Sequence, residues 1–136
     1  AMEESFLLSN ICPQAPGLNR GRWKELEELV REWAQRDSAL LIACGPIVSQ
    51  TPKTIGRHHI AVPSRYFKVV AAPYASRPRG IAFLFDNSDK QPSLRALALP
   101  IDSVEKLTGI DFFYNLPDSI ETPMESNLWI ETWNLN

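Results

Sequence analysis

The sequence predicts an α+β fold with an antiparallel or mixed β-sheet. The chain has 136 residues, of which 44% are hydrophobic, and it contains four Trp and six Phe. This size and composition fit one globular domain with a real core. One long helical pattern comes early, and most later segments are short apolar runs typical of strands. We find no repeat or linker, so we predict a single domain over 1–136: a loop and helix (8–36), a sheet scaffold (39–125) and a tail (126–136).

Composition excludes several classes of protein. A net charge of −2 argues against a strongly basic nucleic-acid scaffold, although a local basic patch stays compatible with it. No apolar run approaches the length of a membrane span, and the acidic start at 1–4 is unlike a signal peptide, so we expect no membrane partner. Cys44 is expected to be a buried thiol and Cys12 to lie in a loop; the sequence leaves open whether they pair.

The first expected elements are a short strand at 5–8, a Pro/Gly-rich loop up to Leu18, and a helix. Asn19 is predicted as the N-cap, since its side chain can accept a hydrogen bond from a free amide of the first turn. The helix runs to about Gln35 and is broken by Asp37 and Ser38. Its predicted apolar stripe has the 3–4 residue spacing of a buried helix face and consists of Trp23, Leu26, Val30, Trp33 and Ala34.

The remaining chain is expected to form strands and one short helix. An apolar run at 39–43 predicts a strand buried on both faces and ended by Gly45-Pro46. Further strands are predicted at 54–62, 66–70 and 81–85, with loops at 72–79 and 86–93. A helix is predicted at 102–109: Asp102 and Glu105 form a start close to a capping box, and Gly109 suits a left-handed end. A tail with Trp129 and Trp133 follows from 124 to 136.

Chemistry concentrates between residues 8 and 27, in LSNICPQAPGLNRGRWKELE. The amide oxygen of Asn19 is a hard ligand that suits Mg²⁺, and the adjacent helix N-terminus favours phosphate; the alternative is a simple N-cap. Glu27 lies eight residues further on, about 12 Å along a helix. It is therefore expected to act through a bound water rather than to share a metal with Asn19. The alternative is an ion pair between Glu27 and Arg31, worth about 0.3–0.5 kcal/mol.

Other polar residues are weaker candidates. Asn10 and Gln14 flank Cys12-Pro13, where loop amides usually satisfy backbone groups but could also orient a phosphate. His58 and His59 are the only histidines, and adjacent side chains on a strand point to opposite faces, so at most one could serve a site. We find no Ser-His-Asp, Cys-His, Walker or zinc pattern. Positive charge gathers around the helix start, on Arg20, Arg22, Lys24 and Arg31.

Five segments together resemble one family. In chain order they are AMEESFLLSNICPQ, LNRGRWKELE, CGPIV, KTIGRHHIAVPSRYFKVV and IDSVEKLTGIDFFYNLPDSIE, and they cover most of the chain. They resemble the sugar-non-specific DNA/RNA endonuclease family, the ββα-metal nucleases of the endonuclease G type. The first two segments are specific in combination, and the later ones resemble the scaffold. The resemblance implies a ββα-metal (His-Me finger) nuclease fold that lacks the N-terminal part.

The resemblance also implies roles and partners. Asn19 matches the Mg²⁺-binding asparagine, and Asn10 an asparagine that arranges the site. Glu27 matches the glutamate that contacts metal-bound water, and Arg31 an arginine near the scissile phosphate. The implied cofactor is Mg²⁺, Mn²⁺ or another divalent cation, and the implied substrates are DNA and RNA. A homodimer, an inhibitor protein, and either a secreted or periplasmic bacterial or an organellar location are all compatible with the family.

One departure from the family is serious. Its general base is the histidine of an Asp-Arg-Gly-His hairpin, and this motif does not occur in the sequence. His58 and His59 match a scaffold segment instead. Two explanations stay open: a fragment of a normal nuclease, or a degenerate domain that binds nucleic acid, metal or a protein partner without catalysis, the last of these through the Trp129/Trp133 tail. On either explanation, we expect the chain alone to have little or no nuclease activity.

Overall fold

A computed structural model describes residues 13–135, so the predicted strand at 5–8, Asn10 and Cys12 lie outside the described residues. The helices are α2 (Pro16–Arg20), α3 (Arg22–Asp37), α4 (Leu94–Leu97), α5 (Ile101–Thr108), α6 (Asp118–Ser126) and the 3-10 helix η1 (Ile130–Trp133). The strands are β1 (Leu41–Ile47), β2 (Lys53–Ile55), β3 (Ile60–Val62), β4 (Arg65–Ala72), β5 (Arg79–Asp86) and β6 (Ala98–Leu99). Within this part of the chain, no helix has the length and apolar character needed to cross a membrane.

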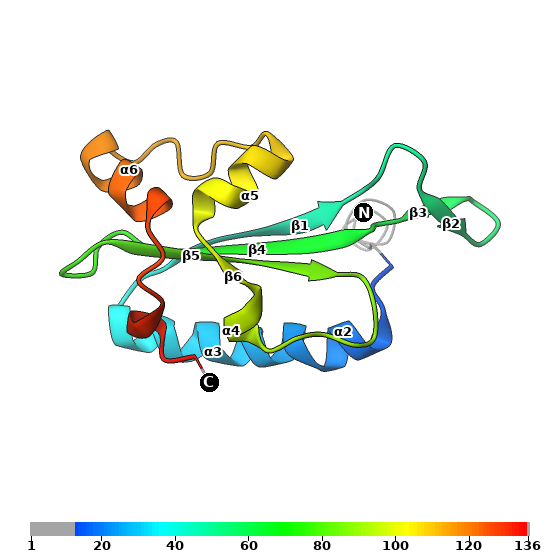
Figure 1. Cartoon of the computed structure of the whole chain (residues 1–136), viewed down its shortest axis with the longest axis horizontal. Coiled ribbons are helices and arrows are strands. Elements are labelled where there is room, and N and C mark those ends of the chain that lie inside the picture. The colour runs from blue at the N-terminus through cyan, green and yellow to red at the C-terminus, as the bar shows by residue number, and fades with distance from the viewer. Residues whose placement is uncertain (1–12, 136) are drawn as a thin grey trace, which may run out of the picture.

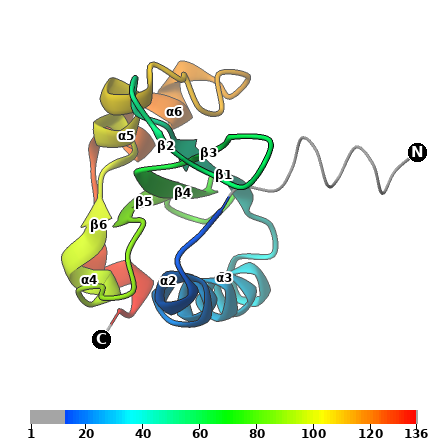
Figure 2. The same cartoon turned by 90° about the vertical axis from the view of Figure 1, so that its right-hand side faces the viewer.

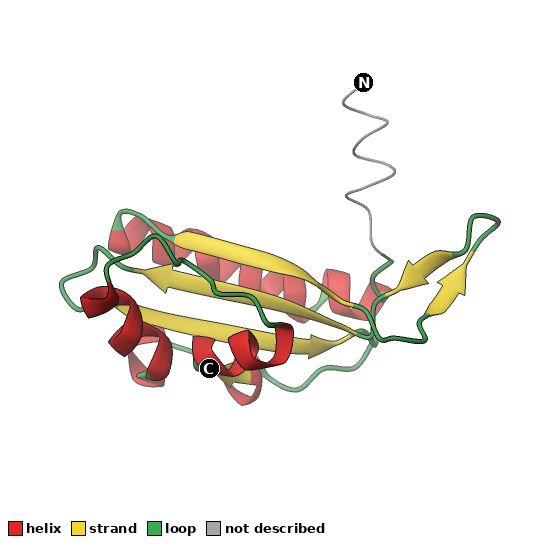
Figure 3. Ribbon diagram, turned by 90° about the horizontal axis from the view of Figure 1, so that it is seen from above, coloured by secondary structure: helices red, strands yellow, loops and turns green. Residues whose placement is uncertain are grey.

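The main sheet has the order β1-β4-β5-β6, and every neighbouring pair is antiparallel, which confirms the predicted fold class. Helices cover both faces of this sheet: α2, α3 and α4 lie on one side, and α5 and α6 on the other (Figures 1 and 2). The β2–β3 hairpin forms a separate two-stranded sheet that projects beyond one end of the main sheet (Figure 3).

Each face of the sheet has its own apolar core. On the α3 side, Leu26, Val30 and Trp33 are buried as predicted, and they pack with residues of β4 and β5. On the other side, Ile101, Val104 and Met124 from α5 and α6 pack against Val69 and Ala82. The central strands β4 and β5 are therefore buried on both faces. Each fully buried Leu, Ile or Phe side chain contributes about 1.5–3 kcal/mol to folding.

Strand β1 differs from the prediction. It runs through Gly45-Pro46 instead of ending there, and its residues alternate between half-buried and exposed. Among the described strands, β1 lies at the edge of the sheet and pairs with β4 alone, and a proline is tolerated at such an edge. Ile42 is 46% exposed, and Cys44 is a free, exposed thiol, so the predicted buried cysteine is wrong.

The predicted strand at 54–62 is two strands joined by a turn at 56–59. Gly56 and His59 adopt positive φ angles of 76° and 51°, a backbone conformation that closes a tight turn. His58 and His59 lie in this exposed turn, so the strand-based argument about their opposite orientation does not apply.

Helix α5 confirms the predicted helix, and Gly109 ends it with φ 74°. The predicted capping box is wrong, because Pro100 occupies the N-cap position. The carboxylate of Glu105 instead accepts a hydrogen bond from the backbone N–H of Phe112, at 2.9 Å. The side chain of Glu105 thus fixes the chain that leaves α5.

The predicted tail is part of the folded core. It contains η1 and the end of α6, and the Trp133 side chain is 0% exposed. The rings of Trp33 and Trp133 meet edge to face at 4.8 Å, and Trp33 Nε1 donates to the Trp133 carbonyl at 3.0 Å. A partner surface that uses Trp133 is therefore wrong, since this side chain is inaccessible.

Candidate metal and phosphate site

Asn19 lies inside the short helix α2 and is not an N-cap, which corrects the prediction. The N-cap position belongs to Ala15, whose side chain makes no capping bond, and Pro16 follows it. Proline suits the first helical position because its fixed φ is already helical and its missing N–H needs no partner. Leu18 is fully buried and anchors α2 in the core, whereas Asn19 is exposed.

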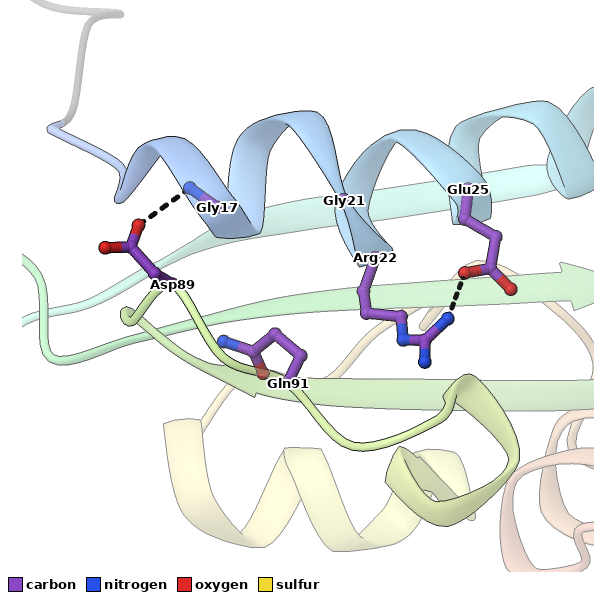
Figure 4. A pocket seen from close by; sticks show the side chains of 6 residues that line it. All are labelled: Gly17, Gly21, Arg22, Glu25, Asp89 and Gln91. Atoms are coloured by element: carbon purple, nitrogen blue, oxygen red, sulfur yellow. Dashed lines mark hydrogen bonds and ion pairs between the residues drawn. The ribbon is translucent and has the colours of Figure 1, made fainter.

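A distant loop caps α2 in place of a local residue. Asn87 Oδ1 accepts a hydrogen bond from Ala15 N at 2.6 Å, and Asp89 Oδ1 accepts one from Gly17 N at 2.7 Å (Figure 4). Asn87 Nδ2 also donates to the carbonyls of Pro13 and Pro63, at 3.0 and 2.9 Å. One asparagine therefore connects the loop before α2, the loop before β4 and the loop after β5.

The contact between α2 and this loop is close. A Cβ atom on Gly17 would lie 2.5 Å from the Asp89 carbonyl oxygen, so the helix and loop can approach this closely only at a glycine. Because the Asp89 carboxylate already occupies the positive end of α2, this N-terminus is not open to phosphate as predicted. Beside the contact lies a shallow pocket of about 260 Å³, with Arg22, Glu25 and Gln91 among its lining residues (Figure 4).

The side chain of Asn19 is oriented by Gln14. Asn19 Nδ2 donates to Gln14 Oε1 at 2.7 Å, and no described residue donates a hydrogen bond to Asn19 Oδ1. This hydrogen bond uses the side-chain nitrogen of Asn19 and leaves its side-chain oxygen available for a metal ion. An amide oxygen is a ligand atom that a hard cation prefers. Mg²⁺ typically takes one or two protein oxygens and completes its shell with water and substrate phosphates. Asn19 therefore fits the role of a single protein ligand.

Glu27 and Arg31 are exposed on α3, which begins after a break at Gly21. Within the described residues, the ion pairs made by α3 are Arg22–Glu25 and those of its last turn, so the alternative Glu27–Arg31 pair is wrong. Both side chains are available to water and ligand, but α3 does not bring Glu27 next to Asn19. Arg22 is held by Glu25 and by the Pro92 carbonyl, which leaves Arg20, Lys24 and Arg31 as exposed cations on this surface.

The projecting hairpin adds positive charge close to this site. Ile55 and Val62 line a pocket of about 240 Å³ together with Gln14, the residue that orients Asn19. Lys53 and Arg57 are exposed on the hairpin, and the sequence contains no Asp or Glu between residues 38 and 85. A polyanion bound at Asn19 would therefore meet a basic arm beside it.

Sequence reasoning missed Asn87 and Asp89. Asn and Asp in a polar loop usually bond to their own backbone, so the local pattern gave no reason to pair them with residues 72 positions away. The tight approach at Gly17 was the available signal, because a glycine directly after Pro16 can mark close packing.

Comparison with known proteins identifies the family of this chain. The family model described as DNA/RNA non-specific endonuclease matches residues 1–119. Human mitochondrial endonuclease G is 30% identical over 131 residues, which cover 85% of this chain and 43% of that protein. A nuclease of Nostoc sp. is 32% identical over 134 residues, covering 91% of this chain and 48% of the relative.

A solved structure supports the fold. The crystal structure of the EndoG/EndoGI complex contains a chain that superposes with a TM-score of 0.71 at 27% identity, covering 88% of this chain and 55% of that one. The α+β arrangement with an antiparallel sheet is consistent with the ββα-metal nuclease fold. The chain spans less than half the length of these two relatives. Since the family model matches most of its residues, the chain belongs to the DNA/RNA non-specific endonuclease family.

Proposed function

We propose that this chain supplies the metal-holding side of a nuclease that hydrolyses phosphodiester bonds in DNA and RNA with little base preference. The observation that carries the proposal is the family match over residues 1–119. The orientation of Asn19 by Gln14, with its oxygen unbonded among the described residues, supports the assignment of the metal ligand.

Asn19 Oδ1 would hold Mg²⁺ or Mn²⁺. The ion, when bound, supplies positive charge that stabilises the negative charge developing on the phosphate and the leaving oxygen. The Arg31 guanidinium would bind a phosphate oxygen as a second source of positive charge. Glu27, and Asn10 outside the described residues, would accept hydrogen bonds from the waters of the site and so fix their orientation.

Activation of the attacking water needs a base within hydrogen-bond reach. The sequence contains no Asp-Arg-Gly-His motif, and its two histidines lie in the exposed hairpin turn. We therefore propose that the 136 residues by themselves hydrolyse little or no nucleic acid, and that a complete active site needs a histidine from outside them.

The specific rival is a degenerate nuclease-like domain that binds nucleic acid, metal or a protein without turnover. The same exposed cations and hairpin support binding in both cases. A protein inhibitor is a proposed partner, because the similar solved structure is described as an EndoG/EndoGI complex that shows a mechanism of EndoG inhibition. A homodimer is proposed on the family resemblance alone.

The test combines metal binding with plasmid nicking by the purified chain. The chain for this measurement carries Glu125→Gln, because Glu125 belongs to a separate group of carboxylates on α5 and α6 that also suits Mn²⁺. In that background we expect Mn²⁺ binding, measured by water-proton relaxation, to be lost in Asn19→Ala and retained in Asn115→Ala, an exposed asparagine between α5 and α6. We expect no nicking of supercoiled plasmid in Mg²⁺. Nicking that Asn19→Ala abolishes would show a complete active site in this chain, and Mn²⁺ binding unaffected by Asn19→Ala would remove Asn19 as the ligand.

In a longer gene product that carries the Asp-Arg-Gly-His hairpin, we expect Mg²⁺-dependent cleavage of both DNA and RNA. Asn19→Ala should lower kcat there by about 100-fold or more, the usual effect of removing a group that stabilises transition-state charge. Binding of nucleic acid without cleavage by that longer protein would favour the degenerate domain.

A further inference from the structure

Helices α5 and α6 lie on the sheet face away from α2 and α3 (Figures 1 and 2). Five carboxylates of these two helices and the loop between them gather in two overlapping groups. Carboxylate oxygens of Asp102, Glu105 and Glu125 lie within 4.8 Å of one another. Oxygens of Asp111, Glu121 and Glu125 meet the same limit, so Glu125 belongs to both groups.

Packing brings these carboxylates together. Ile101 and Val104 of α5 and Met124 of α6 are fully buried against the sheet. Glu125 directly follows Met124 and is only 4% exposed. The packing of Met124 and of α5 against the sheet therefore keeps the Glu125 carboxyl group where water has little access.

Glu125, which is shared by both groups, has a carboxylate oxygen that lacks a hydrogen-bond partner among the described residues. This oxygen, Oε2, is buried. Glu105 accepts one bond, from Phe112 N. None of the ion pairs found in the described part of the chain includes a member of the cluster. A buried carboxylate without a compensating charge costs several kcal/mol.

The electrostatics agree with this geometry. Burial, followed by the negative charge of Glu105, raises the pKa of Glu125 to about 9. Burial is also the main cause that raises the pKa of Glu105 to about 7, and Asp102 adds to it. Carboxylate oxygens held within 4.8 Å of one another disfavour one another's ionised form, and the direction of both pKa shifts agrees with that crowding.

We propose that Asp102, Glu105 and Glu125 bind a Ca²⁺ ion between α5 and α6. All donors are carboxylate oxygens, which select hard cations over zinc or copper. Ca²⁺ accepts six to eight oxygens at about 2.3–2.6 Å in flexible geometry, including several carboxylates. Mg²⁺ requires octahedral geometry and keeps most of its waters, so a group of three carboxylates centred on the buried Glu125 suits it less well.

The second group of carboxylates lies closer to solvent than Glu125 does. Asp111 is exposed and Glu121 is half-buried, so they present negative charge between solvent and the buried Glu125. A bound ion would join α5 to α6 and hold the loop that Glu105 anchors through Phe112. This role is separate from phosphodiester hydrolysis, because Asn19 belongs to α2, and α2 lies on the opposite face of the sheet from α5 and α6 (Figures 1 and 2).

The test is calorimetric Ca²⁺ titration of the chelator-treated chain at mildly alkaline pH, together with thermal unfolding. We expect Ca²⁺ to bind and raise the Tm, and Mg²⁺ at equal concentration to do so much less. Glu125→Gln should weaken Ca²⁺ binding by at least about tenfold, the size of effect seen even for groups that only support ligands. Asp118→Asn is the matched control: it removes one charge from the exposed first turn of the same helix and should retain binding.

Two outcomes would overturn the site. If millimolar Ca²⁺ leaves the heat signal and the Tm of the unsubstituted chain unchanged, the cluster holds protons only. If Glu125→Gln binds Ca²⁺ as the unsubstituted chain does, the ion binds elsewhere. Asn19→Ala should leave Ca²⁺ binding unchanged, so a failure of the proposed nuclease site and a failure of this site give different results.

Discussion

Asn87→Ala should loosen the helix that carries Asn19. The Asn87 side chain accepts a hydrogen bond from Ala15 N and donates two, to the carbonyls of Pro13 and Pro63. These bonds connect segments that are otherwise far apart in the chain. Alanine would remove all three bonds, and with them the capping of Ala15 at the start of α2.

The magnitude follows from these bonds. Each contributes about 1 kcal/mol net, and a backbone group left unpaired costs more where water cannot reach it. Asn87 is half-buried, so water can replace part of the loss. We expect Asn87→Ala to lower the free energy of unfolding by about 2–3 kcal/mol, which is a urea midpoint lower by about 1 M or more.

The assay is urea unfolding followed by Trp fluorescence, with Asn127→Ala as the control. Asn127 Nδ2 donates to the Pro123 carbonyl at the end of its own helix, so the same substitution removes only local bonds there. Asn87→Asp should be intermediate, because it keeps the acceptor for Ala15 N but loses both donors. Mn²⁺ binding at Asn19 should weaken in Asn87→Ala and not in Asn127→Ala. A loss of stability within about 0.5 kcal/mol of the control would refute the reasoning.

Two further predictions concern charge. The raised pKa values of Glu105 and Glu125 mean that the folded state binds these protons more tightly than the unfolded state. In chelator, the stability that these two groups contribute should be fully present below about pH 4.5 and be lost as pH rises through about 7 for Glu105 and about 9 for Glu125. Urea unfolding across this range should show a weaker fall in Glu125→Gln, and parallel curves would contradict the assignment. Replacing Lys53 and Arg57 together by Gln should weaken DNA binding and lower the slope of log affinity against log salt by about 0.9 for each lost phosphate contact. Lys106→Gln on α5 should change neither quantity, and an unaltered slope in the hairpin variant would exclude the arm from binding.

Much of the local structure could be predicted from the sequence. The 3–4 residue spacing of Leu26, Val30 and Trp33 identified the buried face of α3, because helical periodicity does not depend on the partner. Dense apolar runs identified the cores of β4 and β5, and Gly109 ended α5 at the expected residue. The resemblance placed the chain in a nuclease family, which the comparison confirms. The polar residues around Asn19 identified a candidate site, and this site stays a prediction.

Errors arose where local pattern and tertiary position disagree. The apolar run after α3 has the composition of a central strand, but β1 lies at the edge of the described sheet and Cys44 is exposed. Asn19 has the chemistry of an N-cap, yet Asn87 and Asp89 cap the helix one turn earlier. The sequence around Trp133 predicts a tail, but the Trp133 side chain packs against Trp33 in the core.

The sequence by itself determined which residues form the amphipathic helix and the buried strands, and which family the chain resembles. These properties depend on side-chain type and spacing along the chain, which are local. Only the tertiary structure decided that Gln14 orients Asn19 and that Asn87 holds α2. It also decided that carboxylate oxygens of Asp102, Glu105 and Glu125 lie within 4.8 Å of one another. Hydrogen bonds and charge clusters depend on distances of a few ångströms between segments, and packing of the helices against the two faces of the sheet sets those distances.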